Sequence, residues 1–230
     1  MSVYRTPLYG LSFHFRVTLH QAFILMTSIE TYIDRCILPR YDAFDAAHRR
    51  DHAQSVIRRS LEMASHYPEL RTDLVLVAAA CHDIGLAEGR EFHHLASGRM
   101  IRSDKHLLQW FTADEIEAIA QAAEDHRASS GRCPRSLLGM IVAEADRLID
   151  AETVVRRTIL YGLAHYPQLN RQQHYERMRE HLLEKYSEQG YLKLFLPASP
   201  NAAPLQELQR LIHDEPHLKR MFDFMFDELD

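Results

Sequence analysis

Several features that would mark a specialised class of protein are missing from this chain. Its three cysteines include no Cys-x-x-Cys pair, so neither a disulfide framework nor a zinc ribbon is indicated. No apolar run is long enough to cross a membrane, and the first residues lack the cleavage site of a signal peptide. The net charge of −5, with both signs interspersed, gives no basic field for a nucleic acid polymer or an anionic membrane. We therefore expect a protein of the reducing cytoplasm that binds neither.

The composition is that of an ordinary globular protein. With 46% hydrophobic and 26% charged residues, the 230-residue chain is long enough for one main core with an appended piece. Residues 1–25 are unusually rich in aromatic and β-branched side chains. We interpret them as an N-terminal extension outside the native start, with Met26 as the candidate start; an extra element packed on the domain is the alternative.

From Thr27 onward the pattern predicts an all-α protein. Apolar residues recur at spacings of three and four, and no alternating strand run is convincing. Thr112 with Glu115 three residues later forms a capping box that should open a helix. Gly85 is expected to terminate another helix in a left-handed conformation. The expected helices follow Thr27, start near Asp51, and cover about 72–83, 93–102, 112–126, 135–150, 151–166 and 171–189, with two more near the C-terminus.

The most informative feature is the pair His82-Asp83, which ends the apolar run 74–81. An imidazole and a carboxylate are common ligands of divalent transition metals, and an unpaired buried Asp would be costly. A satisfied polar pair at the end of a core helix is the alternative. Two further candidates lie near apolar faces: His126, seven residues after Ile119, and Asp146, four after Val142. A buried, hydrogen-bonded histidine is the alternative for His126.

At these positions the chain resembles the HD-domain metal-dependent phosphohydrolase superfamily. The matching motifs are Asp45-x-x-His48-x-x-Asp51-His52, Ala79-Ala80-Cys81-His82-Asp83-Ile84-Gly85 and Ala143-Glu144-Ala145-Asp146-Arg147-Leu148. The resemblance implies an HD-domain-like helical bundle over 26–150, with residues 151–230 as C-terminal helices packing on it. It also implies that His52, His82, Asp83 and Asp146 hold a metal ion.

Some relatives in that superfamily bind a second ion, with the aspartate of the doublet bridging the two. The resemblance assigns the extra ligands to His94, through His94-x-x-x-Gly98, and to His126, through Glu124-Asp125-His126-Arg127. A short connection between the doublet and His94 is the one departure from the pattern. One or two ions are therefore expected, and histidine ligands favour Mn, Fe, Co, Ni or Zn over Mg.

The resemblance implies hydrolysis of a phosphate ester or anhydride of a small metabolite or nucleotide by metal-activated water. Asp83 or Glu88 is the expected proton acceptor, and Arg90, Arg127 and Arg147 are the expected substrate-binding cations. Arg147 diverges by about 100° from Asp146 on a helix and could serve the fold instead. The alternatives are a mixed-valent di-iron oxygenase and a non-catalytic module that binds metal and nucleotide.

The walls of the substrate pocket are expected to come from the loop 86–92 and from helices after Asp146. Residues of the latter that carry suitable side chains are Tyr161, His165, Tyr191 and Lys193. No motif assigns a partner to any of them, so the sequence leaves the substrate and the oligomeric state open.

Overall fold

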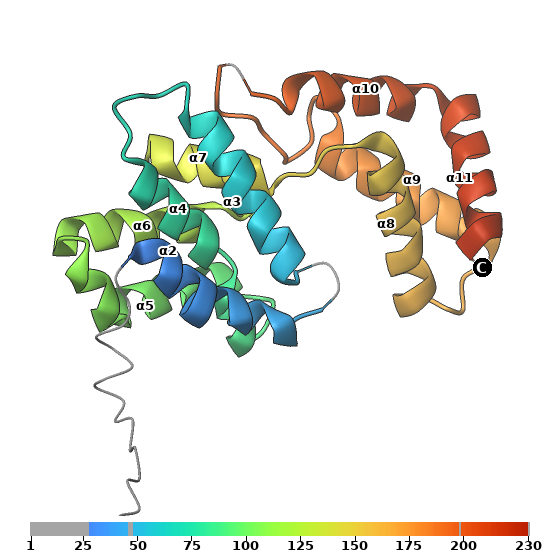
Figure 1. The fold of residues 1–230 in the computed structure, drawn as a ribbon. Helices are drawn as coiled ribbons and strands as arrows, with labels where there is room; N and C mark the ends of the chain where they lie inside the picture. Colours follow the sequence, from blue (N-terminus) through green and yellow to red (C-terminus); the bar gives the residue numbers. More distant parts are fainter. Residues whose placement is uncertain (1–27, 46–47, 198, 230) are drawn as a thin grey trace, which may run out of the picture.

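The chain folds as two groups of helices, which confirms the all-α prediction (Figure 1). The structure is a computed structural model, and it describes residues 28–45, 48–197 and 199–229. No strand occurs within those ranges. The predicted extension at 1–25 lies outside them. Among the described helices, none has the length and apolar character needed to cross a membrane.

The first group contains the helices up to Asp146. Its members are α2 (Ile29–Tyr32), η1 (Ile33–Ile37), η2 (Leu38–Ala43), α3 (Arg50–Ala64), α4 (Thr72–Cys81), η3 (Ile84–Glu88), α5 (His93–Ser103), η4 (Lys105–Gln109), α6 (Ala113–Asp125), η5 (Ala128–Ser130) and α7 (Leu137–Asp146). Their apolar faces share one hydrophobic core. Helix α4 runs through this core, and each of its residues from Val77 to Cys81 is buried. That burial on all sides explains why its sequence is apolar throughout rather than amphipathic.

Local signals explain two features that position the site. The capping box predicted at Thr112 and Glu115 is present at the start of α6. Gly85, however, has no left-handed conformation; among the described glycines only Gly89 and Gly131 have positive φ, so that prediction is wrong. A Cβ atom at Gly85 would lie 2.1 Å from the carbonyl oxygen of His93 and 2.4 Å from the backbone nitrogen of Ser97. Glycine is needed here because the segment after the doublet packs directly on the start of α5.

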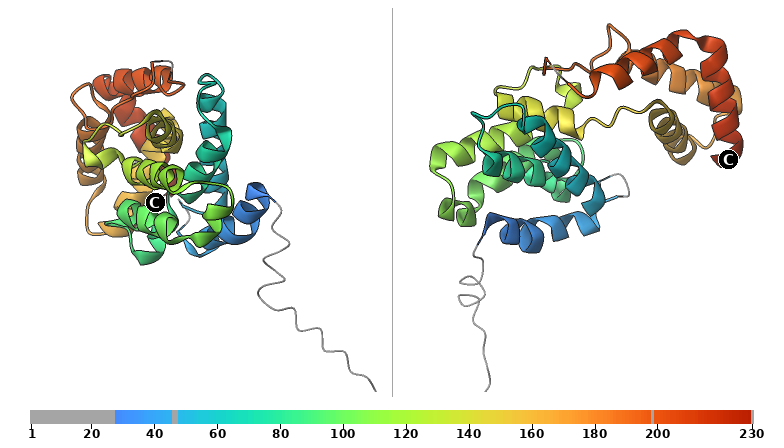
Figure 2. Two further views of the ribbon diagram at one scale, coloured as in Figure 1. Left: turned by 90° about the vertical axis from the view of Figure 1, so that its left-hand side faces the viewer. Right: turned by 45° about the horizontal axis from the view of Figure 1, so that its top comes forward.

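The second group is formed by the C-terminal helices, which have a hydrophobic core of their own. They are α8 (Ala151–His165), α9 (Arg171–Tyr186), α10 (Ala202–His213) and α11 (Glu215–Leu229). Figures 1 and 2 show them to one side of the first bundle, joined to it by the connection from α7 to α8 and by the segment before α10.

A buried carboxyl group joins that segment to the first group. The side chain of Glu144, on α7, accepts hydrogen bonds from the backbone N–H groups of Phe195 and Leu196 and from the Ser199 hydroxyl. The Asn201 side chain donates to the backbone oxygen of Glu144 at 2.8 Å. The C-terminal helices are thus attached through 195–201, while most of their apolar surface is buried among themselves.

Candidate metal centre

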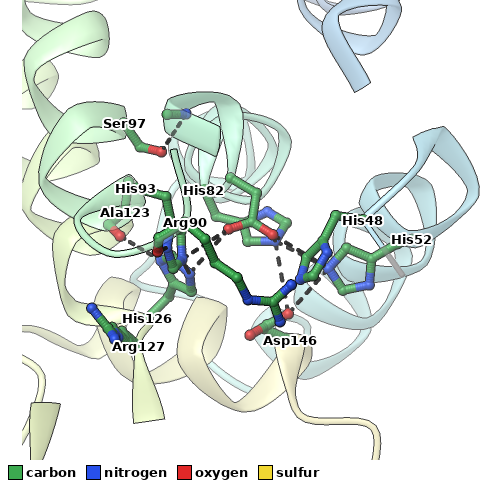
Figure 3. A network of polar contacts seen from close by, with 12 residues as sticks. His48, His52, His82, Arg90, His93, Ser97, Ala123, His126, Arg127 and Asp146 are labelled. Carbon is green, nitrogen blue, oxygen red and sulfur yellow. Dashed lines mark hydrogen bonds and ion pairs between the residues drawn. The ribbon is translucent and has the colours of Figure 1, made fainter. Parts of the chain in front are cut away.

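The four residues of the expected metal site meet at one point between three helices. Figure 3 labels three of them, His52, His82 and Asp146. His52 lies in the first turn of α3, His82 and Asp83 follow the last residue of α4, and Asp146 ends α7. Nε2 of His52 is 3.2 Å from Oδ1 of Asp146 and 3.3 Å from Nε2 of His82. Nε2 of His82 is 3.3 Å from Oδ2 of Asp83. Residues 94 positions apart in the chain therefore present their polar atoms to a common space.

Asp83 belongs to a second cluster through its other oxygen. Oδ1 of Asp83 lies 3.3 Å from Nε2 of His93 and 3.3 Å from Nε2 of His126. These two imidazole nitrogens are themselves 3.2 Å apart. The Asp83 carboxylate therefore stands between two pairs of histidines, one on each oxygen, which is the arrangement of a bridging ligand.

The structure places His93, and not His94, in this second cluster. His93 is the first residue of α5, and its neighbour His94 points in a different direction because successive helical residues diverge by about 100°. The Nδ1 atom of His94 is buried without a hydrogen-bond partner. His94 contributes to a separate cavity lined also by Glu124 and Arg127. The short connection after the doublet brings His93, one position earlier, to Asp83.

Backbone hydrogen bonds fix which nitrogen of each imidazole carries the proton. Nδ1 of His82 is 2.8 Å from the carbonyl oxygen of Ala79, and Nδ1 of His126 is 2.6 Å from that of Ala123. Nδ1 of His93 is 2.7 Å from the backbone oxygen of Arg90. Because a carbonyl oxygen only accepts, Nδ1 must be the donor and the neutral imidazole keeps its lone pair on Nε2. In all three histidines that lone pair is directed at a carboxylate oxygen.

With the Nε2 lone pairs of the imidazoles facing carboxylate oxygens, electron-rich atoms meet without a positive charge between them. Burial alone would lower the pKa of His82, but Asp83 and Asp146 outweigh it and raise that pKa. Burial would likewise raise the pKa of Asp83, yet His82 and His126 hold it well below its usual range. Burial would also raise the pKa of Asp146, but its contact with His52 outweighs burial and lowers that pKa. Oδ1 of Asp83 is buried and, despite the two nearby imidazole nitrogens, accepts no hydrogen bond within the described part of the chain.

This geometry fits divalent metal ions. Four imidazole nitrogens and two carboxylates surround the space, in two groups that share Asp83. A cation between the acceptors would satisfy the buried Asp83 oxygen and the Nε2 lone pairs together. A set with so many nitrogen donors suits Mn, Fe, Co, Ni or Zn better than Mg.

The structure separates the other expected residues from this cluster. Glu88 is exposed and pairs with Arg99 at 2.5 Å, so the expected proton acceptor has a surface partner instead. Arg147 is buried, donates to the backbone oxygen of Lys193 and lies over the ring of Phe195. Arg147 thus stabilises the attachment of the C-terminal segment, the alternative considered for it above.

The two remaining arginines differ from each other. Arg127 is engaged by protein groups, because it donates to the backbone oxygen of Glu91 and to the hydroxyl of Ser129. Arg90 has an exposed side chain, and among the described residues its one ion pair is a long contact, 3.4 Å, with Oδ2 of Asp45. Of the predicted substrate-binding cations, Arg90 is the one whose guanidinium keeps free donors near the site (Figure 3).

His48, which precedes His52 in the first motif, lies beside the cluster. Nδ1 of His48 is 2.8 Å from Oδ1 of Asp45, and its ring centroid is 5.8 Å from that of His52. Asp45 thus holds His48 through one oxygen and Arg90 through the other. The spacing Asp45-x-x-His48 is the only sequence signal for this pair, and it is too common by itself to identify a functional group.

Comparison with known proteins gives one result. A family model described as the HD domain matches residues 49–150. The matched region begins before His52 and ends after Asp146, so it includes every residue of both clusters. No curated protein and no solved structure matches the chain.

Proposed function

This chain contains an HD domain over residues 49–150, and we propose that it is a metal-dependent phosphohydrolase with two metal ions. The observation that carries the proposal is the position of Asp83, with His52 and His82 near Oδ2 and with His93 and His126 at Oδ1. In this proposal His52, His82, Asp83 and Asp146 hold the first ion, and Asp83, His93 and His126 hold the second. The donor set favours Mn, Fe, Co, Ni or Zn.

When bound, such ions supply a nucleophilic water near neutral pH and polarise a phosphoryl oxygen. The protein's own residues supply the rest. The backbone carbonyls of Ala79, Arg90 and Ala123 hold three imidazoles with Nε2 free to act as ligand. The buried α4 and the close packing at Gly85 fix Asp83 between them, so little reorganisation is required on binding.

We assign proton transfer to the leaving group to His48. It is a titratable group next to the cluster that is not needed as a ligand, and Asp45 orients it through Nδ1. Nε2 of His48 would donate its proton to the ester oxygen as the phosphorus–oxygen bond breaks, so that the product leaves as a neutral alcohol. Arg90, held by the same Asp45, would stabilise the charge that develops on the phosphoryl oxygens.

The direct test is phosphate release from p-nitrophenyl phosphate and from a set of nucleotides and sugar phosphates, with each metal supplied in turn. We expect activity that is lost on chelation, restored by a transition metal, and abolished in Asp83→Ala. The matched control is Asp51→Ala, since Asp51 lies on the exposed side of the same region and in neither cluster. Failure of every substrate with every metal would contradict the proposal.

A second candidate function is a mixed-valent di-iron oxygenase, which needs histidine ligands for both ions. The histidines near both oxygens of Asp83 are compatible with it. Metal analysis separates the two. Purified protein with two irons, a charge-transfer absorption and no phosphate release would favour the oxygenase. We place the hydrolase first because the exposed guanidinium of Arg90 lies beside the cluster, where it could bind a phosphoryl group. We further propose that the substrate is a small cytoplasmic molecule.

A further inference from the structure

A cavity of about 560 Å³ lies between the HD domain and the C-terminal helices. Arg90, from the loop before α5, lines it on one side, and the rest of its wall comes mainly from α8 and α9. Tyr161 lines it, as expected from the sequence, whereas Tyr191 and Lys193 do not. The cavity therefore exists only because the chain continues beyond the HD domain.

The charged side chains that line this cavity are predominantly cationic. Arg90, Arg157, Arg177 and Lys185 line it, against two acids, Glu180 and Glu184. Arg157 is exposed and forms no salt bridge with any residue in the described ranges. Such a concentration of cations with few acidic partners attracts an anion, and low-dielectric walls strengthen the attraction.

Arg177 is held in place by neutral groups rather than by an acid. Its guanidinium donates to the backbone oxygen of Thr158 and lies 5.9 Å and 5.6 Å from the ring centroids of Tyr161 and Tyr166. A Cβ atom at Gly162 would be 2.6 Å from Nη2 of Arg177, so α8 needs glycine there to admit the side chain. The positive charge of Arg177 is therefore fixed in position, and no acidic side chain among the described residues forms a salt bridge with it.

The aromatic rings at the cavity serve to hold this arginine. Tyr161 already stacks on His165, with 4.0 Å between ring centroids and an angle of 14° between the planes. One face of the most exposed ring is thus covered by the protein itself. This arrangement favours recognition of charge over stacking of a flat ligand.

The cavity lies next to the candidate metal centre, and two of its lining residues adjoin that centre. Arg90 lines the cavity and also contacts Asp45, which holds His48 beside His52. Leu148, another lining residue, is two positions after Asp146.

We propose that the cavity binds a second anionic group of the substrate, a phosphate or a carboxylate, while the scissile phosphate lies at the metal centre. Arg157, Arg177 and Lys185 are its binding residues. The inference rests on the proposed hydrolase function and adds a substrate class to it, small molecules that carry two separated anionic groups. A monophosphate would fill only one of the two positions.

The kinetic test uses matched pairs of substrates: fructose 1,6-bisphosphate against fructose 6-phosphate, and adenosine 3′,5′-bisphosphate against adenosine 5′-monophosphate. In the wild type, kcat/KM should be higher for the bisphosphate of each pair. In Arg157→Gln, the ratio of bisphosphate to monophosphate should fall about 10- to 100-fold, mainly through KM, as expected for loss of a charge-assisted contact. Arg157→Lys should recover part of the ratio. Equal kcat/KM for the two members of each pair in the wild type would mean that the second anion is not recognised.

Arg156→Gln is the control, because Arg156 precedes Arg157 on α8 but pairs with Glu228 at 2.8 Å and does not line the cavity. It should leave the ratio unchanged. An equal ratio in wild type and Arg157→Gln, with activity present, would overturn the inference while leaving the hydrolase proposal intact.

A binding measurement decides the inference even if no substrate is hydrolysed. The hydrolysis-resistant pair butane-1,4-bisphosphonate and butylphosphonate is titrated calorimetrically into metal-loaded protein at low ionic strength. We expect the bisphosphonate to bind about 10-fold more tightly or better, and the difference to disappear in Arg157→Gln but not in Arg156→Gln. Equal affinities of wild type and Arg157→Gln for the bisphosphonate would reject the second anion site.

Discussion

Nε2 of His93 lies 3.3 Å from Oδ1 of Asp83, so the first residue of α5 reaches the same carboxylate as the histidine that ends α4. If this contact marks a ligand of the second ion, His93→Ala should lower the metal content from about two ions per chain to about one. Plasma emission analysis of protein purified with added metal measures the content. His94→Ala provides the comparison, because His94 packs beside the ring of His93 but is not among the potential metal ligands, and it should retain both ions. Loss of metal in His94→Ala with full content in His93→Ala would reverse the assignment.

Asp83 and Asp146 should differ in how much metal their loss removes. Asp83 serves both clusters, and its replacement by Ala should remove nearly all bound metal and activity together. Of the described histidines, Asp146 contacts those of the first cluster, His52 and His82, so Asp146→Ala should lose the first ion and keep about one per chain. Retention of one ion in Asp83→Ala would argue that the clusters bind independently and that Asp83 does not bridge.

The role assigned to His48 predicts a dependence on the leaving group. Without a proton donor, an alkyl phosphate must expel a strongly basic alkoxide, whereas p-nitrophenolate leaves without protonation. His48→Gln should therefore reduce kcat by about 100-fold or more for the alkyl ester and by far less for the aryl ester. His66→Gln, a substitution of an exposed histidine after α3, should change neither. Equal losses with both esters would show that His48 positions the site rather than donating a proton.

The sequence predicted most of the helices and the four residues that the structure brings together in the first cluster, whose role as metal ligands stays a prediction. Helical periodicity, the Thr112 capping box and the apolar α4 are local signals, and the His-Asp doublet stands out because an apolar helix ends on it. The first helical segment was less predictable. It continues past Pro39 as a 3₁₀ turn, since proline is tolerated in the first turn of a new segment.

The choice between His93 and His94 could not be made from the sequence. Both are plausible ligands, and the outcome depends on how closely α5 packs on the segment after the doublet. That approach is set by Gly85, whose lack of a side chain admits the backbone of His93. The sequence does not predict the hydrogen bonds between Glu144 and Leu196 or Ser199 either, because they link positions about fifty residues apart and no local pattern marks them.

Glu144 should contribute strongly to the stability of the whole chain. Its buried carboxylate accepts hydrogen bonds from Phe195, Leu196 and Ser199. In Glu144→Gln one carboxylate oxygen is replaced by an NH₂ group, which cannot accept a hydrogen bond from the donor that faces it. We expect the free energy of unfolding to fall by about 1–3 kcal/mol. For a chain of this size that corresponds to a decrease in Tm of roughly 2–10 °C. Glu152→Gln, at an exposed position of α8, is the control in a calorimetric melt and should be close to neutral. A neutral Glu144→Gln would mean that the segment is held by other contacts.

His94 gives a prediction for the pH dependence of stability. Burial, followed by the nearby His126, lowers the pKa of His94 to about 4, whereas an unfolded chain has a histidine pKa of about 6.5. At a pH between these two pKa values, His94 is protonated in the unfolded state but not in the folded state. Acid therefore destabilises the fold progressively from about pH 6.5 down to about pH 4.

His94→Gln removes this proton uptake and should lose less stability in that window than the wild type. Thermal melts with a chelator present, at intervals from pH 7 to pH 4, measure the difference. His52 and His82 have raised pKa values and act in the opposite direction, but they are common to both proteins and cancel in the comparison. The gap in Tm between His94→Gln and wild type should widen in favour of the variant as the pH falls. A gap that stays constant from pH 7 to pH 4 would show that His94 is protonated as readily in the folded protein as in the unfolded chain.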